Sequence, residues 1–130
     1  MHRGILIGID HGLKRVGIAV SDENQEFAWP RPIIPTNLIH DTLKAMVAEM
    51  NVVGIVVGMP FMLDGIEGEQ CKVVHAFLDD LRTYIDRDIF TVDERMSSRI
   101  VESLYNTTDD SYVAALILET FMQRRSWTQS

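Results

Sequence analysis

The chain has 130 residues, a mass of 14.8 kDa and 46% hydrophobic residues, which suffices for one hydrophobic core but not for two. Its single cysteine, Cys71, excludes an intrachain disulfide and indicates a reducing compartment, and no apolar stretch approaches the ~20 residues of a membrane span. We therefore expect one cytoplasmic domain over residues 1–130, and the formal net charge of −7 argues against tight, non-specific nucleic-acid binding.

The first third of the chain has the composition of three strands. Residues 4–9 are a continuous apolar run of strand length, and residues 15–21 follow after a short turn, which predicts a hairpin. Residues 27–34 form a third extended segment that contains Pro30 and Pro32. Because proline has no N–H to donate to a neighbouring strand, we expect this segment at the edge of a sheet.

Helical and strand patterns alternate through the rest of the sequence. The predicted elements are a helix at 37–50, a buried strand at 53–58, a loop at 59–65, a helix at 67–84, a strand at 89–92, and helices at about 97–104 and 110–124. Asn37 is the expected N-cap of the first helix, and Ser97 or Ser98 that of the third. This order predicts an α/β fold with a five-stranded mixed sheet flanked by helices.

Three acidic residues stand where such a fold would place a site. Asp10 follows the first strand and Glu94 the last, so both are expected at the edge where parallel strands end, and Asp110 opens the final helix. Clustered carboxylates repel one another unless a cation lies between them, and Mg²⁺ or Mn²⁺ prefers such oxygen ligands. Two ions about 3.5–4 Å apart would suit the hydrolysis of a phosphodiester.

Each of these acids also has a purely structural interpretation. Asp10 precedes a turn, and turns favour aspartate. Asp110 could complement the dipole of the helix that it opens. Glu94 could form a surface ion pair with Arg95 or Arg99. Spacing alone leaves these alternatives open.

Four motifs carry a family resemblance. They are GIDHGLKRVGIAVS at 8–21, VVGMPFMLDG at 56–65, DER at 93–95 and DSYVAALIL at 110–118. In these motifs the chain resembles the YqgF/RuvX family, whose members are described as Holliday-junction resolvases and as pre-16S rRNA processing nucleases. The resemblance covers nearly the whole chain, and it implies an RNase H-like fold.

The same resemblance implies an activity and its residues. Asp10, Glu94 and Asp110 would be the metal-binding, catalytic triad of a divalent-metal-dependent nuclease that cleaves structured nucleic acid. The implied substrate is precursor 16S rRNA, and the alternative is branched DNA at a Holliday junction. A junction with two-fold symmetry would favour a homodimer.

Basic residues near the motifs are the expected substrate contacts. Lys14, Arg15 and Arg95 would touch the nucleic-acid backbone, although basic pairs are equally common on an ordinary solvated surface. Residues 58–65 would form a loop beside the site. His11 is expected to be a solvated loop histidine.

Two other classes of protein compete with the nuclease. Relatives usually carry a longer, lysine-bearing connector before the final helix, whereas residues 105–109 contain no basic side chain. A nucleic-acid-binding or ribosome-binding module without turnover is therefore one alternative. The other is a phosphotransferase of the actin and sugar-kinase type, which shares the strand order but needs two lobes around its nucleotide, more than 130 residues supply.

Overall fold

A mixed β-sheet forms the centre of the computed structural model, which describes residues 3–60, 68–105 and 111–129. Within these ranges the strands are β1 (Ile5–His11), β2 (Arg15–Ser21), β3 (Ala28–Pro35), β4 (Val52–Met59) and β5 (Asp88–Asp93). Their order in the sheet is β3-β2-β1-β4-β5. β1, β4 and β5 run parallel, whereas β2 is antiparallel to both β1 and β3. The predicted five-stranded mixed sheet is confirmed.

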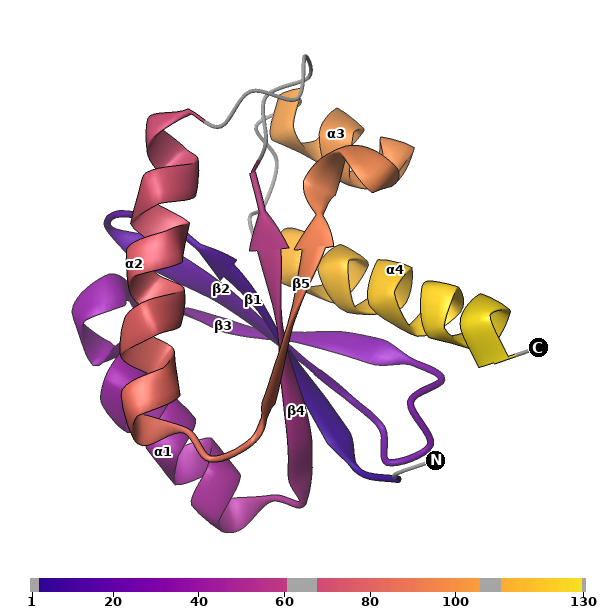
Figure 1. The fold of residues 1–130 in the computed structure, drawn as a ribbon, viewed down its shortest axis with the longest axis horizontal. Helices are drawn as coiled ribbons and strands as arrows, with labels where there is room; N and C mark the ends of the chain where they lie inside the picture. Colours follow the sequence, from indigo (N-terminus) through magenta and orange to yellow (C-terminus); the bar gives the residue numbers. More distant parts are fainter. Residues whose placement is uncertain (1–2, 61–67, 106–110, 130) are drawn as a thin grey trace.

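Helices cover both faces of this sheet (Figure 1). In the described ranges they are α1 (Ile39–Glu49), α2 (Glu69–Tyr84), α3 (Ser98–Tyr105) and α4 (Ser111–Gln129), with 3₁₀ turns η1 (Thr36–Leu38) and η2 (Glu94–Met96). α1 and α2 lie against one face, α4 lies against the other, and α3 follows the end of β5 (Figure 1). None of these helices combines the length and the apolar character that a membrane crossing requires.

The two faces of the sheet bury separate halves of the core. Ile7 and Ile9 of β1 are fully buried beneath α1 and α2, together with Leu43 of α1. Leu6, which points to the opposite face, is buried with Ile117 of α4. Because both faces are covered, the central strands are apolar at nearly every position, which is why β1 and β4 read as continuous apolar runs in the sequence.

The helix starts match the sequence prediction only in part. Ser97 caps α3 as expected, since its hydroxyl accepts a hydrogen bond from the backbone N–H of Ile100 at 3.2 Å. The prediction for Asn37 was wrong, because the helical turn already begins after Pro35 and Asn37 lies inside η1. α1 follows directly, and its N-cap residue, Leu38, makes no side-chain cap.

The outer strand β3 carries the prolines that placed it at the sheet edge. Pro30 and Pro32 lie within it, and among the described strands it pairs with β2 alone. Four consecutive residues of β3, Trp29 to Pro32, are exposed. The prediction of an edge strand is therefore confirmed.

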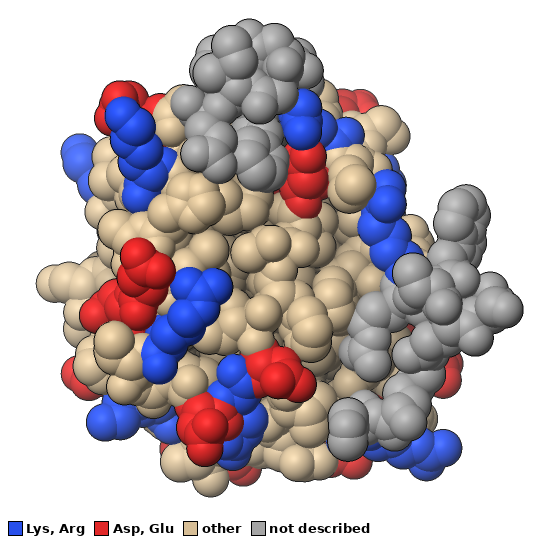
Figure 2. Space-filling model, in the orientation of Figure 1, with Lys and Arg blue, Asp and Glu red and all other residues tan. Residues whose placement is uncertain are grey.

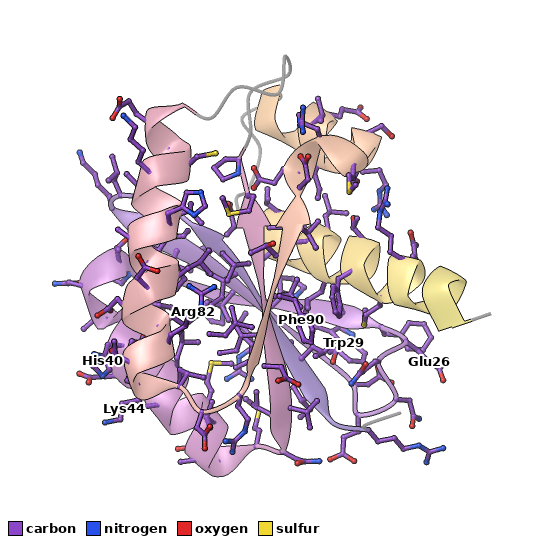
Figure 3. The ribbon with its side chains drawn as sticks, in the orientation of Figure 1. Glu26, Trp29, His40, Lys44, Arg82 and Phe90 are labelled. Carbon is purple, nitrogen blue, oxygen red and sulfur yellow. The ribbon has the colours of Figure 1, made fainter. Side chains whose placement is uncertain are left out.

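An aromatic contact joins α1 to the end of α2. The ring of His40 stacks on that of Tyr84, with ring centroids 3.8 Å apart and an interplanar angle of 15°. Figure 3 shows His40 on α1 beside the last turns of α2, with Lys44 and Arg82 nearby on the two helices. This contact packs α1 against the C-terminal end of α2, the two helices that cover one face of the sheet.

Gly8 sets how closely α4 approaches the sheet. A Cβ atom at this position would lie 2.7 Å from the carbonyl oxygen of Ala114 and 2.5 Å from Cγ of Leu118. Real Cβ atoms essentially never come so close to backbone oxygen, so a side chain on Gly8 would push α4 away from β1.

We expect Gly8→Ala to lower the free energy of unfolding by about 1–3 kcal/mol, because the added methyl group overpacks this contact. Urea unfolding followed by circular dichroism measures the loss. Gly54→Ala is the matched control, since its Cβ would meet the side-chain ends of Leu6 and Phe90 at 3.1 Å and these can shift. Equal losses for the two variants would contradict the close approach of α4.

Candidate active site at the carboxyl ends of the strands

Two of the three predicted acids lie at one edge of the sheet. Asp10 is the penultimate residue of β1 and pairs with Gly17 of β2. Glu94 follows the last residue of β5 and begins η2. β4 runs between β1 and β5, and all three strands are parallel, so their carboxyl ends share the edge drawn at the top of Figure 1. The predicted placement of Asp10 and Glu94 is confirmed.

Glu94 is a buried acid. Only 4% of its surface is exposed. A Cβ atom on Gly58 of β4 would lie 3.0 Å from Glu94 Oε1, so the carboxylate rests against the backbone of the strand between β1 and β5. Its position depends on the absence of a side chain at Gly58.

The pKa of Glu94 is raised to about 7, first by burial and then by the negative charges of Asp10 and Asp93. Burial removes the water that would stabilise the ionised carboxylate, and the two neighbouring acids repel it. Asp10 and Glu94 therefore interact electrostatically in the folded protein. Such a site favours a bound cation, because a positive ion between the carboxylates would relieve the repulsion.

The surface ion pair considered for Glu94 is not formed. Arg95 instead binds Asp93, with Nη2 to Oδ2 at 2.5 Å and Nε to Oδ1 at 3.0 Å. Arg99 pairs with Glu119 of α4 at 3.1 Å. That alternative is therefore wrong, and the burial of Glu94 supports a role in the site.

Asp93 is a neighbour of the site that the sequence prediction missed. Hydrogen bonds from the Arg95 side chain are the largest cause of a lowered pKa for Asp93. Its carboxylate also accepts a hydrogen bond from the backbone N–H of Arg95 at 3.0 Å, which caps η2. Arg95, predicted to contact substrate, thus holds the turn that carries Glu94. The spacing of Asp, Glu and Arg in residues 93–95 is the signal that could have revealed this.

His11 differs from the solvated histidine expected from the sequence. Its ring stacks on Phe77 of α2 with centroids 4.3 Å apart, and its Nδ1 is buried without a hydrogen-bond partner among the described residues. Burial lowers the pKa of His11. Its backbone oxygen accepts a hydrogen bond from Gln70 Nε2 at 3.1 Å. These contacts fix the end of β1, next to Asp10, against α2.

The remaining predicted site residues are Lys14, Arg15, Asp110 and the segment 58–65. Lys14 and Arg15 are exposed, in the turn between β1 and β2 and at the start of β2. Of the loop expected at 58–65, Gly58 and Met59 are instead the last residues of β4, because the strand runs further than its apolar core predicts. Asp110 and residues 61–65 lie outside the described residues. Within the described part of the chain, no three His, Cys, Asp or Glu side chains group closely enough to hold a metal ion.

The charged surface agrees with an acidic protein that has local basic pairs. Figure 2 shows Lys and Arg interspersed with Asp and Glu on the face in view. The described residues on that face form no continuous basic field (Figure 2). The described part of this face therefore lacks the continuous positive charge that would support tight, non-specific binding of a polyanion.

Comparison with known proteins identifies the class of protein. The RuvX family, described as "Holliday junction resolvase", matches residues 4–124. This protein belongs to that family, as its motifs indicated. Its fold is similar to that of Thermus thermophilus RuvC solved in complex with a Holliday junction substrate, with a TM-score of 0.57 and 14% identity over 96% of this chain and 97% of RuvC. The RNase H-like fold is thereby confirmed.

Individual relatives carry a more specific name. The "Putative pre-16S rRNA nuclease" of Sulfurihydrogenibium sp. (strain YO3AOP1) is 33% identical over 134 residues, covering 95% of this chain and 92% of the relative. The protein of the same name from Rickettsia bellii (strain OSU 85-389) is 31% identical over 130 residues, covering 90% and 84%. The similarity thus extends over nearly the full length of each of these chains.

The raised pKa of Glu94 predicts a pH dependence of stability in the metal-free protein. Because the folded protein holds this proton more tightly than the unfolded chain does, the contribution is fully present below about pH 4.5 and is lost as pH rises through about 7. The full loss is of the order of 3 kcal/mol.

Glu94→Gln cannot lose this proton, so we expect its stability relative to wild type to rise across the same pH range. Urea unfolding at a series of pH values in EDTA measures the difference. Glu102→Gln, at an exposed position of α3, is the matched control and should track wild type. A Glu94→Gln protein less stable than wild type at pH 8 would make Glu94 a structural residue.

Proposed function

We propose that this protein is a divalent-metal-dependent endonuclease that hydrolyses phosphodiester bonds of structured nucleic acid during pre-16S rRNA processing. The observation that carries the proposal is the buried Glu94, which is repelled by Asp10 at the carboxyl edge of an RNase H-like sheet. Such a pair destabilises the apo-protein, so it is better explained by ion binding than by folding. The names of the relatives support the nuclease and the rRNA substrate.

Asp10, Glu94 and Asp110 would hold Mg²⁺ or Mn²⁺ in this proposal, in a site for two ions. When bound, such ions activate water and stabilise the charge that develops on the scissile phosphate. The chain itself supplies the positions of the ligands. β1 and β5 deliver Asp10 and Glu94 to one edge, and the Arg95 to Asp93 ion pair holds the turn that carries Glu94. Lys14 and Arg15 would contact the backbone of the substrate.

We expect Asp10→Asn, Glu94→Gln and Asp110→Asn each to reduce Mn²⁺-dependent cleavage by at least about a thousandfold, because a lost ligand removes the stabilisation of transition-state charge. Cleavage of a precursor 16S rRNA fragment, measured on denaturing gels, tests this. Glu102→Gln is again the control and should keep full activity.

Protein that cleaves nothing in any divalent metal would refute the nuclease and favour the binding module. An acid whose replacement lowers the free energy of unfolding by several kcal/mol would be structural rather than catalytic. The three variants therefore need stability measurements alongside the cleavage assay.

Metal binding should release a proton from Glu94. Because the pKa of Glu94 is about 7 in the apo-protein, we expect Mn²⁺ binding at about pH 6 to release close to one proton and at about pH 9 almost none. Calorimetry in buffers of different ionisation enthalpy counts the protons. Glu94→Gln should weaken Mn²⁺ binding and abolish the release. Release that persists in this variant would place the titrating group elsewhere.

Junction resolution is the second candidate function, because the family that matches this chain is described as Holliday junction resolvase. The two functions differ in substrate preference. Cleavage of a four-way DNA junction by symmetric nicks, at rates above those on precursor rRNA, would favour the resolvase. A resolvase of this kind would act as a homodimer, which sedimentation of the protein–junction complex measures.

A further inference from the structure

The turn between β1 and β2 is held rigidly beside the candidate active site. The backbone N–H of Gly12 donates to the carbonyl oxygen of Arg15 at 3.0 Å. Thr36 of η1 then fixes the turn twice, because its N–H donates to the oxygen of Lys14 at 2.9 Å and its hydroxyl to that of Gly12 at 2.8 Å. The turn thus has little freedom to move.

The residue at the tip of this turn is a leucine with 71% of its surface exposed. Leu13 is the most exposed large hydrophobic residue in the described part of the chain. Isolated exposed leucines are common and need no explanation on their own. This one differs because the backbone on both sides of it is hydrogen-bonded, so the side chain is held out in water.

The exposed Leu13 lies close to predicted site residues. It follows Asp10 by three residues, so the two Cα atoms lie at most about 11 Å apart. Lys14 and Arg15 come next and are both exposed. Along the chain, an exposed apolar tip thus lies between a carboxylate of the site and two exposed cations, a combination suited to a polymer with both phosphates and flat apolar bases.

We propose that Leu13 is a wedge that inserts against a base next to the scissile phosphate and holds the substrate strand unstacked there. The proposal rests on the nuclease function proposed above and adds a specificity-determining residue to it. Lys14 and Arg15 would hold the neighbouring phosphates. Because the turn is already ordered, binding would not incur the entropy cost of ordering a flexible loop. Partial unstacking by an inserted aliphatic side chain is an established way in which proteins deform nucleic acid.

A fluorescent base tests the wedge directly. A four-way DNA junction and an RNA stem-loop, each with 2-aminopurine placed in turn at positions around the cleavage site, are bound to Glu94→Gln protein so that they stay intact. We expect a rise in fluorescence at one position, which reports unstacking there. Adding Leu13→Ala should abolish the rise, whereas adding Leu13→Met should keep it.

Cleavage by the otherwise wild-type protein provides the second measurement. Leu13→Ala should lower kcat/KM by roughly tenfold. The variant lacks the apolar surface that Leu13 would bury against the base when the substrate binds. A mismatch that already unstacks the target base should restore most of this loss, a rescue that a merely structural role would not produce.

The matched control is Phe27→Ala. Phe27 is 61% exposed, and its ring lies tilted against that of Trp29 with ring centroids 6.2 Å apart. Trp29, labelled in Figure 3, pairs with Val20, toward the end of the sheet opposite the candidate site. Phe27→Ala should leave fluorescence and cleavage unchanged. Equal fluorescence with and without Leu13→Ala in the Glu94→Gln protein, or equal cleavage by Leu13→Ala and wild type, would overturn the wedge alone, because the nuclease would still be active. No binding or cleavage by wild type would overturn both proposals.

Discussion

The site depends on one electrostatic conflict, the burial of the Glu94 carboxylate beside Asp10. Three parallel strands create it, because β1 and β5 end on either side of β4 and bring both acids to one edge. Gly58 leaves room for the carboxylate, and the Arg95 to Asp93 ion pair holds the turn that carries it. Holding two acids together costs stability, and the divalent cation proposed above would offset that cost.

Much of the architecture could be predicted from the sequence because its signals are local. Buried strands in a sheet covered on both faces are apolar runs, and the prolines of β3 identify an edge. The placement of Asp10 and Glu94 followed from the rule that parallel strands end together. Asn37 shows the limit, since Pro35 started the helical turn earlier and left Asn37 inside it.

The surroundings of the acids could not be predicted, because they arise from contacts distant in sequence. Nothing near His11 indicates that Phe77 will stack on it, and a loop histidine with no visible partner is most simply expected in water. Arg95 was predicted to contact substrate or to pair with Glu94, and its actual pairing with Asp93 depends on the geometry of a 3₁₀ turn. The role of Asp110 remains an inference from the family resemblance.

The prolines of β3 also restrict how two copies of this protein could associate. Pro30 and Pro32 are two residues apart, so their nitrogens face the same side of the strand, and neither can donate a hydrogen bond. Because proline cannot donate to a ladder of hydrogen bonds, these two residues hinder the addition of a further strand at the β3 edge. An association of two copies through the β3 edge would therefore depend on side-chain contacts more than on backbone hydrogen bonds, whereas β5 forms the opposite edge of the sheet without a proline.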